Sequence, residues 1–259
     1  MELPVFTTIL VQGFLICLAR VAAVFAVIPV FSGGQIPPQM RIGVAVMFAL
    51  LSYPVVYQVL PTEALTVVEV AMIIAAEVIF GLLVGFLAQL IFMAAEFAGS
   101  VVGTQMGFAM ANVFDPSTQM QVALLAQFQG VFAILLFLSL NVHHLFLEGI
   151  VASFMHLPPG QLNLAGGAIP MLVELSSHAL VLSMRLAAPV LGLLILISLV
   201  LGLMNRIFPQ LPVFLLSFPL KIGVSLMVMA MTLGVVAAIL ENEFSQLSER
   251  FLRLFDLLS

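Results

Sequence analysis

Residues 105–119 read Gln105-Met-Gly-Phe-Ala-Met-Ala-Asn-Val-Phe-Asp-Pro-Ser-Thr-Gln119, and they interrupt a chain that is otherwise almost continuously apolar. Four soft, bulky side chains gather in this segment: Met106, Phe108, Met110 and Phe114. Such side chains can form a compliant seal, because they fill space and leave no hydrogen bond unmet when they part. We therefore predict that this segment is the functional site of the protein.

The flanks of the segment predict how it is held. Gly99, Gly103 and Gly107 precede it at intervals of four residues and give one helix face without side chains, which lets another backbone approach closely. Asp115 and Pro116 supply a turn signal at its end. The alternative is a tight helix crossing followed by an ordinary connecting loop, and residue chemistry alone leaves both interpretations open.

The composition indicates a membrane protein or the core of a very apolar assembly. Of 259 residues, 63% are hydrophobic and 7% are charged, against about 25% charged in a soluble domain. No linker divides the chain, so we expect one domain over residues 1–259. The net charge of −5 and the lack of a basic cluster argue against nucleic acid as a partner. The N-terminus has no basic region typical of a secretory signal peptide, and Cys17 is interpreted as a buried apolar side chain.

Apolar runs separated by turn residues predict an all-α fold of helices of the integral-membrane type. A span needs about 20 mostly apolar residues. The turns lie at Gly, Pro and Ser clusters, and we expect about six to eight helices. The candidate segments are 5–31, 42–60, 67–95, 97–114, 121–140, 171–204 and 213–240.

Basic residues near the ends of spans indicate orientation. Arg206 and Lys221 flank a proline-rich stretch, 206–219, that is predicted to turn the last hairpin on the cytoplasmic side. Arg41 marks a second cytoplasmic candidate.

Four charges lie inside apolar runs: Arg20, Glu77, Glu96 and Arg185. Charges at membrane depth are costly and are usually paired or turned toward water. They could line a proton or ion path, or they could form ion pairs that fix helix packing. We favour ion pairs, because no segment carries a file of carboxylates at helical spacing.

The tail, residues 241–259, predicts an amphipathic helix. Its apolar residues recur at intervals of three and four and alternate with four acidic residues and two arginines. Such a helix suits a membrane surface or a partner helix, and the negative charge favours the partner helix. The apolar stripe consists of Phe244, Leu247, Phe251, Leu254, Phe255 and Leu258.

No motif of catalysis or cofactor binding is evident, and we expect neither an enzyme nor a cofactor. His144 and Glu148 share a helix face, but His143 points about 100° away from them. A zinc protease motif would need two histidines at that spacing with a glutamate between them. We therefore predict no metal site, and interpret the polar residues 141–144 as one end of a span.

Three stretches together carry a resemblance to a known family. They are Gln105-Met-Gly-Phe-Ala-Met-Ala-Asn-Val-Phe-Asp-Pro116, Leu138 with Asn141 and His143, and Arg206-Ile-Phe-Pro-Gln-Leu-Pro-Val-Phe-Leu-Leu-Ser-Phe-Pro-Leu-Lys221. On these the chain resembles the FliR family, the single-copy subunit of the flagellar type III export gate, over essentially its whole length. The third stretch is the most specific. The chain departs from the family pattern at Pro212, usually a polar position, and at Ser217, often glycine.

The resemblance implies a hetero-oligomeric gate in the bacterial inner membrane, within the flagellar basal body. FliP, FliQ and FlhB would be the partners, with FlhA and unfolded export substrates as further contacts. It also implies a FliP-like part, 1–184, followed by a FliQ-like hairpin and tail, 185–259. Residues 106–118 would plug the channel, and Arg206, Pro209, Gln210 and Lys221 would contact neighbouring subunits. A self-contained secondary transporter or ion channel is the alternative function, although no convincing inverted repeat supports it.

Overall fold

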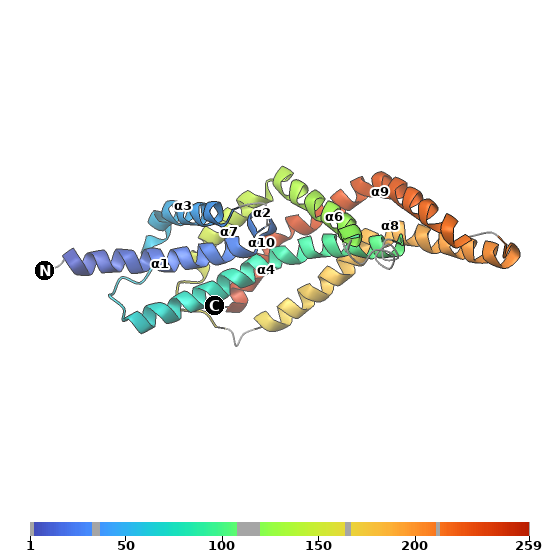
Figure 1. Cartoon of the computed structure of the whole chain (residues 1–259). Helices are drawn as coiled ribbons and strands as arrows, with labels where there is room; N and C mark the ends of the chain where they lie inside the picture. The colour runs from blue at the N-terminus through green and yellow to red at the C-terminus, as the bar shows by residue number, and fades with distance from the viewer. Residues whose placement is uncertain (1–2, 33–36, 108–119, 164–166, 211–212, 259) are drawn as a thin grey trace. The chain divides into compact units, whose positions relative to one another are not determined.

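The computed structural model describes residues 3–32, 37–107, 120–163, 167–210 and 213–258. Within these ranges the regular structure is entirely helical, as the sequence predicts (Figure 1). In the described part of the chain, five helices are long and apolar enough to cross a membrane, or six if the consecutive helices α6 and α7 count as one broken span. The helices are α1 (Leu3–Val27), α2 (Pro29–Ser32), α3 (Pro38–Val56), η1 (Tyr57–Val59), α4 (Val67–Gln105), α6 (Met120–Ser139), α7 (Val142–His156), α8 (Ala168–Ile207), α9 (Val213–Ser245) and α10 (Leu247–Leu258).

Two of the predicted segments are one helix. The sequence predicts a break between 67–95 and 97–114, but α4 runs without interruption from Val67 to Gln105. The residue at the expected break is Glu96, which is a good helix former, and neither glycine nor proline stands beside it. A charge interrupts an apolar run without ending a helix, so the predicted break is wrong.

One helix was not predicted. The sequence predicts that residues 141–144 form the polar end of a span, yet α7 begins at Val142. Asn141 adopts a left-handed conformation with φ of 57°, which asparagine tolerates better than most residues and which turns the chain into a new helix. Val142, Phe146, Ile150 and Phe154 then recur at four-residue intervals and are all buried.

The chain forms two compact units. Unit 1 comprises Met1–Leu90, Asn141–Ser176 and Ser245–Ser259, and unit 2 comprises Ile91–Leu140 and Ser177–Phe244. The predicted division into FliP-like and FliQ-like parts compares this chain with other proteins, and it stays a prediction.

Unit 1 brings α10 back onto earlier helices. The apolar stripe of α10 is at most 2% exposed, and it consists of Leu247, Phe251, Leu254, Phe255 and Leu258. The ring of Phe251 lies edge-on to Phe146 of α7 with 4.8 Å between the ring centroids. Phe255 packs against Phe80 of α4 at 5.6 Å. The expectation that a partner helix covers this stripe is wrong, because helices of the same chain cover it. The periodicity correctly predicts one buried helix face, but an apolar stripe does not reveal which helix it packs against.

Candidate functional site

α4 ends immediately before the predicted seal. The amide of Met106 still donates to the carbonyl of Val102 at 2.9 Å, and the amide of Gly107 donates to that of Thr104 at 3.2 Å. Gly107 has a φ of 97°, a region that side chains with a Cβ atom rarely adopt. A Cβ atom at Gly107 would also lie 2.7 Å from the ring of Phe218 in α9. Glycine is therefore required where the chain leaves α4.

A close helix crossing fixes α4 two turns before its end. A Cβ atom at Gly99 would collide with the carbonyl oxygen of Leu125 and lie 2.8 Å from the Cα atom of Ala126, so the backbones of α4 and α6 touch. Gly103, one turn later, is buried. The close crossing that the glycine spacing predicts is thus present at Gly99. That this crossing holds a seal in place is a separate prediction.

The predicted seal lies only partly within the described residues. Met106 is fully buried in unit 2, with an exposed fraction of 0%. Phe108, Met110 and Phe114 lie outside the residues that the structure describes, as do Asp115 and Pro116. Their assigned roles stay predictions.

The turn between α8 and α9 is shorter than predicted. The sequence places it over 206–219, but Arg206 still belongs to the last turn of α8, and α9 begins at Val213. Pro219 lies inside α9, because an apolar helix held by its neighbours can accommodate a proline. Arg206, Pro209 and Gln210 are exposed at this tip, whereas Lys221 lies two turns into α9 and is half-buried.

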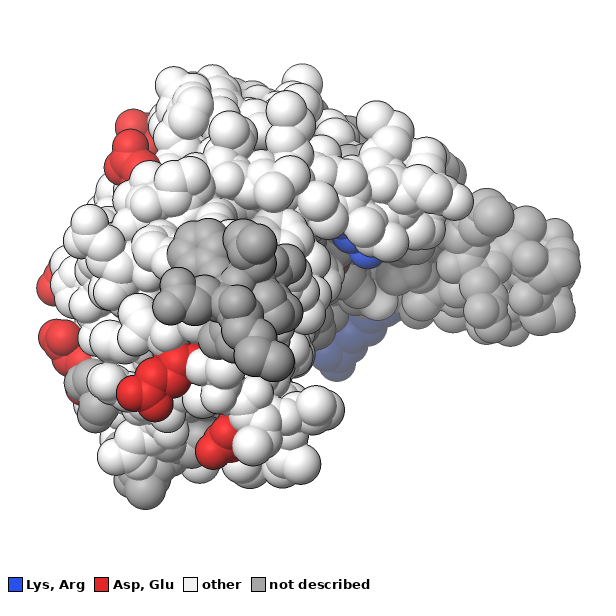
Figure 2. Space-filling view, turned by 90° about the vertical axis from the view of Figure 1, so that its left-hand side faces the viewer, with Lys and Arg blue, Asp and Glu red and all other residues white. Residues whose placement is uncertain are grey.

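The charged side chains are few and differ in their surroundings. Figure 2 shows one face on which uncharged residues cover most of the surface and the acidic residues stand apart from one another. Arg20 and Glu77 form an ion pair with side-chain exposures of 0% and 2%, which confirms the ion-pair interpretation for these two residues. Glu96 and Arg185 make no ion pair with any residue in the described ranges.

Arg20 is held on every side within unit 1. In addition to the ion pair with Glu77, its guanidinium donates hydrogen bonds to Ser153 Oγ at 3.0 Å and to the carbonyl of Leu157 at 2.9 Å. The rings of Phe80 and Phe154 lie 4.5 and 4.0 Å from the guanidinium carbon. Hydrogen bonds, an opposite charge and two aromatic faces together offset the cost of burying this cation.

The sequence does not predict a contact between His178 and Glu243. Nε2 of His178 in α8 lies 3.0 Å from both carboxylate oxygens of Glu243 in α9. A signal for it exists: a hairpin that turns at about residue 210 brings position 178 beside position 243, as the register of two antiparallel helices requires. The pair joins the two helices of the hairpin far from its tip.

The other histidines form no metal site among the described residues, where no group of three or more potential metal ligands occurs. The rings of His143 and His144 lie 4.2 Å apart, and Glu148 is exposed. Nδ1 of His156 lies 3.0 Å from the carbonyl of Ala152 on its own helix.

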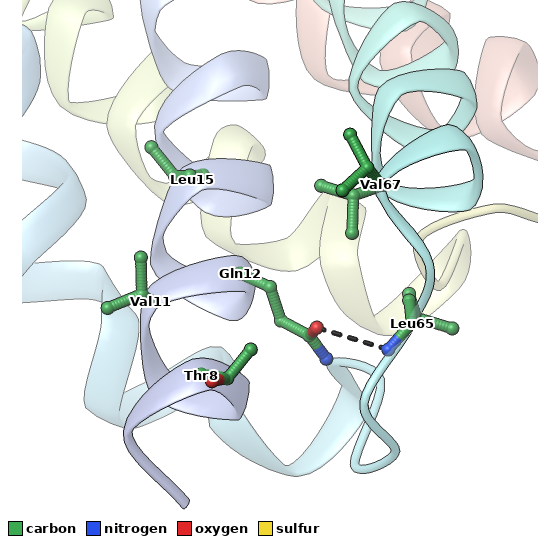
Figure 3. Close-up of a pocket in the computed structure, with 7 residues that line it drawn as sticks. Thr8, Val11, Gln12, Leu15, Leu65 and Val67 are labelled. Carbon is green, nitrogen blue, oxygen red and sulfur yellow. Dashed lines mark hydrogen bonds between the residues drawn. The ribbon is translucent and has the colours of Figure 1, made fainter. Parts of the chain in front are cut away.

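Unit 1 contains an open apolar pocket of about 570 Å³ between α1 and the start of α4 (Figure 3). Val11 and Leu15 form one wall, and Val67 lies on the other. Gln12 fixes the two walls, since its side-chain oxygen accepts a hydrogen bond from the amide of Leu65 at 3.2 Å and its nitrogen donates to the carbonyl of Glu63. No residue pattern predicts this pocket.

The long apolar helices, the buried ion pair and the scarcity of surface charge define a multi-pass helical membrane protein. A family model described as bacterial export proteins, family 1, matches residues 11–247. The chain is 35% identical over 240 residues to flagellar biosynthetic protein FliR of Bacillus subtilis (strain 168), covering 91% of this chain and 92% of that protein. It is 32% identical over 232 residues to FliR of Escherichia coli (strain K12), covering 89% and 87%. The chain therefore belongs to the FliR family of bacterial export proteins.

Proposed function

We propose that this protein is a non-enzymatic subunit of the flagellar protein export gate, in which residues 106–114 close the channel for unfolded flagellar proteins. The observation that carries the proposal is the mounting of this segment. α4 is fixed against α6 at Gly99 and ends at Gln105, and the Met/Phe-rich segment begins at the next residue. Gly107, with its positive φ, turns the chain away from the helix axis there.

The proposed mechanism is steric. The buried side chain of Met106 anchors the start of the segment inside unit 2. Phe108, Met110 and Phe114 then fill the lumen of the channel and exclude water and ions. An apolar constriction closes by dewetting, and thioether and phenyl groups can part for an arriving polypeptide and close again. Asp115 and Pro116 end the segment. The energy for export comes from elsewhere in the machine.

The proposed partners follow from the family. The protein joins FliP, FliQ and FlhB in the inner membrane at the base of the flagellum, and meets FlhA and the transiting substrates there. Arg206, Pro209 and Gln210 are exposed at the tip of the α8–α9 hairpin and are available to neighbouring subunits. Lys221 is half-buried and would contact a neighbouring subunit from the side of α9 rather than from the tip of the hairpin.

Buried packing supports a gate subunit over a self-contained transporter. Arg20 and Glu77, two of the four charges that a transport pathway could use, are occupied by each other and by fixed groups of unit 1. Ion pathways instead need charged groups that face water.

The experiment that tests the proposal is a deletion of residues 108–114 in cells that produce the full set of gate subunits. Met106 and Gly107 stay in place, so that the end of α4 is preserved. We expect the gate to assemble in normal amounts and the membrane to leak ions, seen as slower growth and a lower membrane potential. Ser117→Ala, just beyond the deleted residues, is the control. An assembled gate with a normal membrane potential would sink the plug assignment.

A further inference from the structure

α8 presents a regular exposed face on its side of unit 2. The face repeats at intervals of three and four residues, which is the spacing of one side of a helix. Its apolar members are 46–60% exposed, and its other members are also exposed. We call it the Arg185 face, and it consists of Val181, Arg185, Ala188, Gly192, Leu196, Leu199 and Leu203.

The opposite side of α8 is already packed. Leu182, Leu186, Val190 and Leu194 are 1–3% exposed and lie in the core of the protein. The Arg185 face is therefore surface that remains after α8 has made its own contacts.

A polar notch interrupts this apolar face. The guanidinium of Arg185 makes no hydrogen bond or ion pair with the residues of the described ranges. Pro189, also exposed, has no amide hydrogen, so it cannot donate the regular helical hydrogen bond to the carbonyl of Arg185 four residues earlier. One spot thus carries a cation without a protein partner among the described residues and a carbonyl that lacks its usual helical donor.

The notch is open enough for another backbone. Ala188 and Gly192 follow Arg185 on the same face at small-xxx-small spacing, and a Cβ atom at Gly192 would meet no atom within 4 Å. Small residues at this spacing let two helices approach closely, whereas contact with lipid chains does not require them. A partner helix therefore fits the face better than lipid does.

We propose that the Arg185 face docks an apolar helix of a partner protein, and that a carboxylate of this helix binds the Arg185 guanidinium. A carboxylate is the group whose geometry and charge match an unpaired guanidinium, and an ion pair at an apolar interface fixes both depth and register. The inference rests on the proposed function in one respect, because it requires that the chain work inside an assembly.

The test places a photo-crosslinking residue at Leu196 in the full-length chain, in cells that produce its natural partners. We expect an adduct with a membrane protein whose crosslinked helix carries Asp or Glu. Arg185→Glu reduces the adduct about tenfold or more, since charge reversal at a close pair weakens binding strongly, and Arg185→Lys retains most of it. Changing the partner's acidic residue to Arg restores the adduct of the Arg185→Glu chain.

A second variant covers the case in which Arg185→Glu fails to accumulate. Gly192→Leu meets open space within this chain, so its amount in the membrane is unchanged, but the added side chain blocks the notch and the adduct is lost. The proposal is overturned by adducts with lipid alone, by no adduct, or by an adduct that both variants leave undiminished. Restoration by Glu96→Arg or Asp115→Arg also overturns it, since the pair would then form within the chain. A leaking plug deletion together with any of these results would keep the proposed function and remove this inference.

Discussion

The guanidinium of Arg20 and the carboxylate of Glu77 form a buried ion pair that joins α1 to α4. One helical turn further along α4, a Cβ atom at Gly81 would lie 2.7 Å from the carbonyl oxygen of Arg20, so the two backbones nearly touch beside the pair. Arg20 also holds the carbonyl of Leu157, just beyond the end of α7. Three helices of unit 1 therefore meet at a single cation.

Removing one partner of this pair should destabilise unit 1 strongly. Glu77→Met leaves an uncompensated buried cation, and we expect a loss of about 3–5 kcal/mol in the free energy of unfolding. The double variant Arg20→Met with Glu77→Met should lose less than Glu77→Met alone, because no charge remains buried. Denaturant unfolding of the detergent-solubilised protein measures both. The account would be contradicted if the double variant lost as much free energy of unfolding as Arg20→Met and Glu77→Met lose together when each is made alone.

The crossing of α4 and α6 should tolerate no side chain at Gly99. Gly99→Ala brings a methyl group against the α6 backbone, and we expect a loss of roughly 1–3 kcal/mol through overpacking. Gly223→Ala in α9 is the matched control, since nothing lies within 4 Å of its position. The control should be neutral, or more stable by about 0.5–1 kcal/mol, because alanine favours the helix. Equal melting temperatures for the two variants would argue against a close crossing.

Gly107 should be irreplaceable for conformational reasons. Gly107→Ala forces a Cβ atom into a left-handed conformation that costs about 1–2 kcal/mol, and it also meets the ring of Phe218. Adding Phe218→Ala removes the collision but not the backbone strain, so the double variant should recover only part of any defect in motility. Full recovery would show that the collision alone matters.

α10 should depend on its buried stripe. Phe255→Ala empties a site that is 1% exposed and should cost about 3–5 kcal/mol. The helix would then detach, and protease would cleave near residue 246 faster than in the unchanged protein. Leu252→Ala, at a position that is 45% exposed, should leave the cleavage rate unaltered. Equal protection of the two variants would mean that α10 is held by other contacts.

The sequence predicted what depends on local pattern. The apolar runs, the stripe of α10 and the close crossing at Gly99 follow from residue spacing, because side chains on one helix face share one environment. The buried charges were also informative, since Arg20 in an apolar run needs a partner.

The rest depends on contacts between distant residues. Position 77 as the partner of Arg20 follows from the packing of α1 against α4, which spacing along one helix cannot show. Asn141 is an ordinary polar residue until its left-handed conformation starts α7. The family resemblance supplied the predicted role of residues 106–114, and no local pattern could have assigned a channel to them.

The most direct test of the central claim is the ion conductance of the purified gate complex in a planar bilayer. Two triple variants at Phe108, Met110 and Phe114 are compared, one with three serines and one with three leucines. Three leucines keep an apolar seal of similar bulk, so the complex should remain closed, whereas three serines admit water and should open a steady conductance. Closed complexes with both variants, at normal subunit composition, would contradict the claim that these side chains close the pore.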